Sequence, residues 1–155
     1  MTTSTSDAWR GDGTRFGIIA GGFSISLFAI CYFIDREMVL QRWLWLGSFA
    51  IYLFAMWQAQ SKVVGDEFKD LIQPGFLVFV IANFLFYVYY HLLFAAFDPE
   101  LIDLQAKMLE AAGQDPSDAK VPTWGGTFFS YVQSLMGGFA FAAIIAVFIR
   151  FQKNR

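Results

Sequence analysis

The sequence has little of what reactive or cross-linked proteins use: one cysteine, one histidine and only 15% charged residues in a chain of 155. A single cysteine, Cys31, excludes a disulfide within the chain, and paired cysteines at metal-binding spacing are absent. The net charge of -2 gives no basis for binding nucleic acid. Motifs of nucleophile elbows, HExxH zinc sites, phosphate-binding loops and dinucleotide-binding folds are also missing. We therefore expect that the protein is not an enzyme and holds neither a metal nor a cofactor.

Apolar residues, by contrast, make up 57% of the chain, and 19% of the residues are aromatic. A soluble domain of this size could not bury so much apolar surface. Four segments without lysine, arginine, aspartate or glutamate each come close to the roughly 20 residues that a membrane-spanning helix needs. These segments are residues 16–34, 43–60, 76–97 and 128–149. We expect an all-α polytopic membrane protein in which residues 1–155 form a single domain, a bundle of four transmembrane helices.

The distribution of positive charge predicts the orientation, because lysine and arginine are more frequent on the cytoplasmic side. With the N-terminus inside, seven lysines and arginines lie inside and four lie outside. We expect a protein of the bacterial inner membrane with its N-terminus and C-terminus in the cytoplasm. The first apolar segment is longer than the apolar region of a signal peptide, so we expect it to be retained.

The connection Asp98–Thr127 is the only long one, and it begins with signals for a helix. Asp98 is a favourable N-cap, Pro99 suits the first helical position, and apolar residues follow at helical spacing. We expect an amphipathic helix at about 99–112 in the outer loop. It could rest on lipid headgroups or on its own bundle, or it could dock a partner protein.

The connection before the third segment holds a shorter helical pattern. Asp66 can cap a short helix in which Phe68, Leu71 and Ile72 share one face, which favours a position on the inner membrane surface. Pro74 and the glycine after it are expected to break the chain before the third span.

Small residues recur at four-residue spacing in the first and last segments, a pattern that lets two helix backbones approach closely. The positions are Gly13, Gly17 and Gly21 in the first, and Ser130, Ser134, Gly138, Ala142 and Ala146 in the last. We expect the two stripes to pack against each other, with Gly17 and Gly21 near Gly138. An interface with a second copy or a partner, or a groove for a small molecule, would be an alternative use of the same residues.

Polar side chains share one face of the third segment: Asn83, Tyr87, Tyr90 and His91. We regard Asn83 as the one strongly polar residue well inside a span. Because lipid offers an amide no partner, we expect Asn83, Tyr87 and Tyr90 to face the bundle and His91 to lie at its outer rim. A lone histidine beside tyrosines is more often a hydrogen-bonding residue than a metal ligand, and one histidine cannot supply a metal site.

Two short segments flank the third span, Gly65–Lys69 before it and Phe97–Leu101 after it, and the last helix carries Gly137-Gly138 and a basic end. In this order the features resemble domain-of-unknown-function family 4199, a set of small four-helix bacterial membrane proteins. The resemblance covers nearly the whole chain. It implies a four-helix inner-membrane protein and no particular activity. The 19 phenylalanines are more than is usual for the family.

No span carries a carboxylate or a basic amine, which disfavours ion-coupled transport. We therefore expect a non-catalytic structural or accessory subunit that contacts membrane lipids and assembles with itself or with a larger membrane complex. The alternative is a binding module or handler for a lipid, a quinone or another apolar small molecule. The aromatic density of the third segment supports that alternative, with Phe76, Phe79, Phe84, Phe86, Tyr87, Tyr89 and Tyr90.

Overall fold

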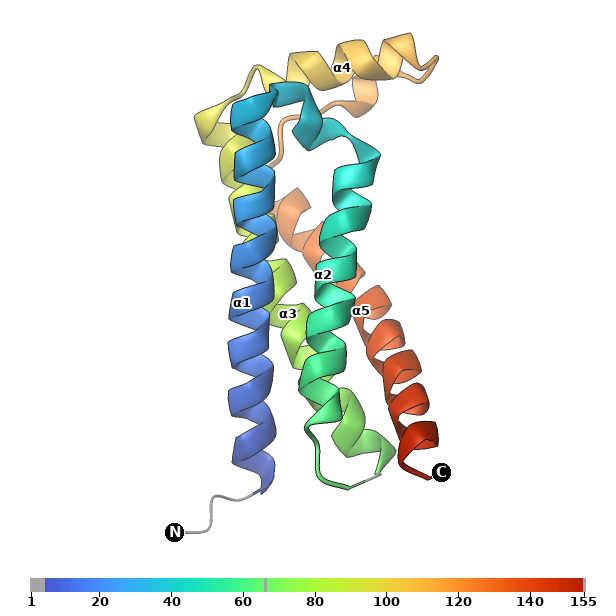
Figure 1. Ribbon diagram of the computed structural model, residues 1–155. Helices are drawn as coiled ribbons and strands as arrows, with labels where there is room; N and C mark the ends of the chain where they lie inside the picture. The colour runs from blue at the N-terminus through green and yellow to red at the C-terminus, as the bar shows by residue number, and fades with distance from the viewer. Residues whose placement is uncertain (1–4, 66, 155) are drawn as a thin grey trace.

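The computed structural model describes residues 5–65 and 67–154, with side chains from residue 9 onward, and every regular element within them is helical. Four long α-helices run along the molecule, and a shorter one, α4, lies across one end (Figure 1). The long helices are α1 (Thr5–Ile34), α2 (Arg42–Ser61), α3 (Phe68–Leu92) and α5 (Trp124–Lys153), and α4 is Leu101–Ala111. Short helical turns are η1 (Arg36–Leu40), η2 (Leu93–Phe97) and η3 (Pro116–Asp118). The all-helical fold is thus confirmed for the described residues.

Both ends of the described chain lie on one side of the bundle. In Figure 1, α1 begins and α5 ends at the end opposite to α4. We call these the terminal end and the α4 end.

Three helical stretches are long and apolar enough to cross a membrane: Trp9–Ile34, Phe68–Phe97 and Trp124–Lys153. Large apolar side chains cover their outer surfaces, as at Phe33 and Phe128, which are 85% and 66% exposed. Such a surface belongs in lipid rather than in water. The fourth expected span, α2, is not among these stretches, because three tryptophans and two glutamines among its twenty residues lower its hydropathy.

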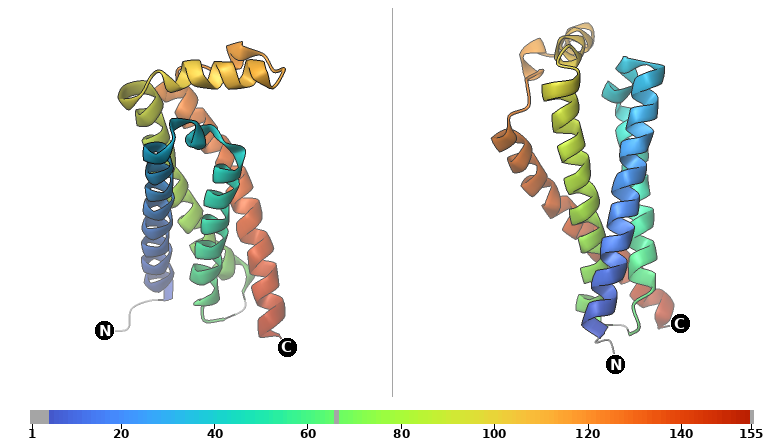
Figure 2. Two further views of the ribbon diagram at one scale, coloured as in Figure 1. Left: turned by 45° about the horizontal axis from the view of Figure 1, so that its top comes forward. Right: turned by 90° about the vertical axis from the view of Figure 1, so that its left-hand side faces the viewer.

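The helix α3 is the centre of the bundle and packs against α1, α2 and α5 (Figure 2). Because it is central, residues on several of its faces are buried, among them Val78, Phe79, Ala82 and Phe86. The other long helices therefore cover different sides of α3.

The expected packing of the two small-residue stripes against each other is wrong. A Cβ atom built on Gly17 of α1 would come within 2.8 Å of the Ile81 Cβ in α3, and one built on Gly21 would come within 3.1 Å of the Ala82 Cα in α3. On α5, a Cβ atom at Gly138 would overlap the Phe79 ring, which also belongs to α3. Each stripe thus lets its own helix approach α3, which separates α1 from α5.

The expected break before the third span is also wrong. The helix α3 runs without interruption from Phe68 to Leu92 with Pro74 inside it. A side chain at the next residue, Gly75, would overlap the side chain of Gln60 from α2. The glycine therefore makes room for a neighbouring helix instead of ending its own. The proposed cap at Asp66 lies outside the described residues.

The helix α4 begins at Leu101, later than expected, and no side chain caps it, since the residue in the N-cap position is Glu100. Leu101 is fully buried, and Ile102 and Leu104 pack against the core. These contacts hold the start of α4 on the end of the bundle.

Candidate functional site

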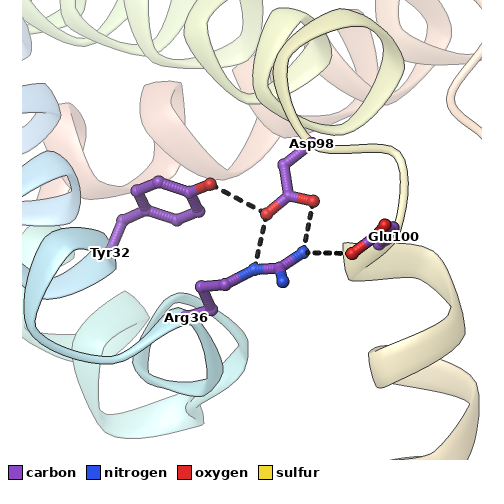
Figure 3. Close-up of polar contacts among 4 residues, drawn as sticks. All are labelled: Tyr32, Arg36, Asp98 and Glu100. Atoms are coloured by element: carbon purple, nitrogen blue, oxygen red, sulfur yellow. Dashed lines mark hydrogen bonds and ion pairs between the residues drawn. The ribbon is translucent and has the colours of Figure 1, made fainter.

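Four polar residues form a cluster at the α4 end of the bundle: Tyr32, Arg36, Asp98 and Glu100 (Figure 3). The Asp98 carboxylate lies at its centre and is buried, with 7% of the residue exposed. Arg36 Nε donates to Asp98 Oδ2 at 2.7 Å, and Arg36 Nη2 donates to Oδ1 of the same carboxylate. The Tyr32 hydroxyl donates to Asp98 Oδ2 at 2.8 Å.

The backbone after α3 explains why Asp98 reaches this cluster. The π-helical turn η2 ends with the Asp98 N–H donating to the Leu93 carbonyl at 2.8 Å, five residues back. This wider turn ends α3 and carries the chain towards the end of α1, where Tyr32 and Arg36 lie (Figure 3). The expectation that Asp98 caps the following helix is wrong, because its carboxylate is bound by residues from α1 and η1 instead.

The electrostatics of the cluster favour a structural role. Two parallel N–H donors from one guanidinium are the strong geometry for binding a carboxylate. The hydrogen bond to Asp98 raises the pKa of Arg36 above its ordinary value. A second contact, from Arg36 Nη2 to Glu100 Oε2 at 3.3 Å, is weaker because Glu100 is 80% exposed. With its carboxylate so engaged, Asp98 joins the end of α1 to the start of α4.

The polar residues expected on one face of α3 contact two different helices, α5 and α2. Asn83 Nδ2 donates to Ser134 Oγ of α5 at 2.6 Å, and Tyr87 packs edge-on against Tyr131 of α5. Tyr90 instead contacts α2, with its ring 5.2 Å from that of Trp45.

His91, which was expected at the rim, is buried with 3% exposed. Its Nδ1 lies 2.9 Å from Thr127 Oγ1, and its ring stacks on Trp124 at the start of α5 with centroids 3.7 Å apart. The histidine therefore joins α3 to α5. Within the described residues, no group of three or more histidine, cysteine, aspartate or glutamate side chains could hold a metal ion.

A cavity of about 250 Å³ lies between α2, α3 and α5, and we call it the interhelical cavity. Its lining residues are Trp45, Ser48, Phe49, Tyr52, Phe79, Asn83, Phe86, Tyr87, Ser134, Gly137, Gly138 and Phe141. The cavity brings together Asn83, Tyr87, Ser134 and Gly138 from the residues singled out in the sequence. The remaining small residues expected on α5 differ in exposure: Ser130 is exposed, whereas Ala142 and Ala146 are fully buried.

The sequence reasoning missed two glutamines in the apolar segments. Gln60 is fully buried, and its Nε2 donates to the carbonyls of Leu71 in α3 and Ala142 in α5, at 2.9 and 2.8 Å. Gln133 is exposed on α5, on the apolar surface. Asn83 is therefore not the only strongly polar residue in the apolar segments, and a search for every amide within them would have found Gln60 and Gln133.

Comparisons with known proteins identify the family but no characterised relative. Neither the curated proteins nor the solved structures include a match to this chain. The family model described as "Protein of unknown function (DUF4199)" matches residues 15–150, which include α2 and α3 in full and most of α1 and α5. The chain therefore belongs to the DUF4199 family, as the segments around its third helix indicated.

Proposed function

We propose that this protein is a non-catalytic accessory subunit of the bacterial inner membrane that crosses the bilayer four times and assembles with a partner helix through α5. The observation that carries the proposal is an exposed stripe of small and polar residues on the half of α5 nearer α4. That stripe needs a partner that the bundle itself does not provide.

Two features of α2 support the fourth crossing. Its 20 residues span about 30 Å at 1.5 Å per residue, which matches the hydrocarbon thickness of a bilayer. It also runs beside the three more apolar helices (Figure 1). An even number of crossings agrees with α1 beginning and α5 ending at one end of the bundle. The excess of lysine and arginine at that end supports a cytoplasmic location for both termini.

The packing of α5 supports assembly. All of its buried residues lie between Gly138 and Ile149, so the preceding part of the helix has none. Four small or polar residues at spacings of four, three and four are exposed there, and we call them the α5 stripe: Gly126, Ser130, Gln133 and Gly137.

The position of Gln133 makes this exposure costly in lipid. It lies about 8 Å from the midpoint of α5, counted at 1.5 Å per residue, within a hydrocarbon layer roughly 30 Å thick. An amide facing hydrocarbon has no hydrogen-bond partner, whereas a neighbouring helix can provide one. The small residues beside Gln133 would let that helix approach closely.

A photo-cross-linking amino acid at position 133 tests the proposal in native membranes. We expect one discrete protein adduct from position 133 and none from position 23. Position 23 is the control, because Phe23 is also exposed on the apolar surface, at 62%, but lies on α1 and outside the α5 stripe. An adduct of twice the chain mass would identify a second copy as the partner. The substitution Ser130→Leu should reduce the adduct by blocking close approach. If position 133 forms adducts with lipid alone, assembly through the α5 stripe is excluded.

A further inference from the structure

The interhelical cavity exists because α5 crosses α3 obliquely. Towards the α4 end, α5 moves away from α2, so the two helices lie on different sides of α3 (Figure 2). Near Gly138 the helices are close, and there the rings of Phe49 in α2 and Phe141 in α5 meet edge to face with centroids 4.9 Å apart. Beyond this contact no atom of another helix lies within 4 Å of where a Cβ on Gly137 would stand. The open space is therefore bounded by three apolar helices.

The walls of the cavity are mostly aromatic. Seven of the twelve lining residues carry a ring, from all three helices: Trp45, Phe49, Tyr52, Phe79, Phe86, Tyr87 and Phe141. Ring edges and faces favour stacked or edge-on contacts with another planar group. A flexible acyl chain would use the same walls less well, since it has no flat face.

The hydrogen bonds of the polar lining residues indicate which polar group an occupant should carry. Most donors in the walls are already used within the protein. Ser48 donates to the Trp45 carbonyl at 2.8 Å, Ser134 to the Tyr131 carbonyl, and Tyr52 to the Ala82 carbonyl at 3.4 Å.

One donor hydrogen is left over. Asn83 Nδ2 uses one of its two hydrogens, for Ser134 Oγ, whereas the Tyr87 hydroxyl has Ser134 as its hydrogen-bonding neighbour. Asn83 lines the cavity. An occupant with a hydrogen-bond acceptor would satisfy the second hydrogen of Asn83, and an unmet donor in an apolar environment is unfavourable.

We propose that the interhelical cavity binds a planar, ring-bearing apolar molecule with a carbonyl acceptor, which is the chemistry of a quinone head group. A cavity of roughly 150 Å³ holds benzene, so about 250 Å³ accommodates one or two fused rings. The carbonyl accepts from Asn83 Nδ2, and the ring lies among the aromatic side chains of α2, α3 and α5. The proposal does not depend on assembly through α5.

Binding can be measured on the purified full-length protein in detergent with 2-methyl-1,4-naphthoquinone as the probe. Quinones quench tryptophan fluorescence, and Trp45 lines the cavity. We expect saturable quenching and an increase in Tm for the natural sequence. Quenching that rises linearly without saturation would mean that the probe only partitions into micelles, and it would overturn the proposal.

Variants that fill the cavity provide the decisive comparison. Gly137→Phe should weaken naphthoquinone binding at least tenfold, and Ser48→Leu should do so from the α2 side if the first variant folds poorly. Gly47→Phe is the matched control, because no atom of another helix lies within 4 Å of the Gly47 Cβ position and Gly47 does not line the cavity. It should bind as the natural sequence does.

Asn83→Leu tests the hydrogen bond itself. Removing one donor should weaken binding about fivefold, since a net hydrogen bond contributes of the order of 1 kcal/mol. Native mass spectrometry distinguishes a ring-bearing occupant of the cavity from a phospholipid. A phospholipid retained one-to-one, lost in Gly137→Phe and not displaced by the naphthoquinone would contradict the proposal.

Discussion

Gln60 lies where α2, α3 and α5 meet, and its side-chain amide donates to a backbone carbonyl in each of the other two helices. Its carbonyl oxygen, Oε1, is buried without a hydrogen-bond partner among the described residues. The two donated bonds contribute about 0.6 kcal/mol each in a membrane protein, while an unpaired buried acceptor costs about 1–3 kcal/mol. These magnitudes nearly cancel. Gln60 therefore selects one arrangement of three helices more than it stabilises the bundle.

This balance predicts that Gln60→Leu changes the free energy of unfolding by less than about 1 kcal/mol in either direction, because lost bonds and the lost unpaired oxygen offset each other. Gln60→Ala should be more destabilising, since it also leaves an empty space beside Gly75. Thermal unfolding in detergent compares the two variants. A large loss for Gln60→Leu would mean that Oε1 has a partner, such as a bound water.

Asp98 shows a different balance, because its carboxylate is charged and buried while its partner Arg36 is partly exposed. Asp98→Asn should destabilise the protein by about 1–3 kcal/mol, since it removes charge-assisted hydrogen bonds to Arg36 and Tyr32. Glu100→Gln is the matched control and should cost less than about 0.5 kcal/mol, because Glu100 is 80% exposed. Equal effects of the two substitutions on Tm would show that burial of Asp98 does not matter.

At the scale of an element, the glycines of α1 show how one helix face is chosen over another. Gly13, Gly17 and Gly21 let α1 approach α3 closely. The adjacent Gly22 faces away, and no atom of another helix lies within 4 Å of its Cβ position. Two adjacent glycines in one helix thus differ, because Gly21 packs against α3 and Gly22 does not. Replacing a packed glycine should lower the free energy of unfolding, whereas replacing Gly22 should leave it unchanged or raise it.

Gly17→Ala should destabilise the bundle by about 1–3 kcal/mol, because the added methyl group would press on the Ile81 side chain and force the two backbones apart. Gly22→Ala should be neutral or stabilise by up to about 1 kcal/mol, because alanine has the higher helix propensity and meets no neighbour. Both variants can be compared by thermal unfolding in one detergent. A loss of stability for Gly22→Ala as large as that for Gly17→Ala would argue against the α1–α3 contact.

At the scale of the whole molecule, polar contacts close both ends of an apolar bundle. At the α4 end these are the contacts of Asp98. At the terminal end, Lys153 Nζ of α5 donates to the carbonyls of Val63 and Gly65. The Lys62 Nζ also lies 3.5 Å from Asp12 Oδ1 of α1. The apolar surface between these ends is where a bilayer would lie.

This arrangement predicts the accessibility of single cysteines introduced into a Cys31→Ala background. Lys120→Cys, on the α4 side, should react with a membrane-impermeant maleimide added outside spheroplasts. Gln152→Cys, at the terminal end, should react only after the membrane is permeabilised. Both positions are exposed, so burial does not limit the reaction. Labelling of position 152 from outside would reverse the proposed orientation.

Some of this structure follows from local sequence properties. The apolar segments free of charge predict helices at 16–34, 76–97 and 128–149, because the cost of charge in lipid applies to each residue wherever its neighbours lie. The helix after Asp98 is visible from another local property, the helical spacing of its apolar residues. The segments around the third helix were enough to indicate the family.

The pairing of helices was decided only by the tertiary structure. Glycine spacing shows that a face of α1 can be approached closely, but the partner is the helix whose surface fits it best, and here α3 wins over α5. Asp98 could cap a helix by its position in the sequence, yet it binds Arg36, which lies 62 residues away. Pro74 could end a helix, yet α3 continues through it and Gln60 packs against the adjacent Gly75. Local propensities are properties of one segment, whereas packing and ion pairing compare the free energies of competing partners, and that comparison exists only in the folded bundle.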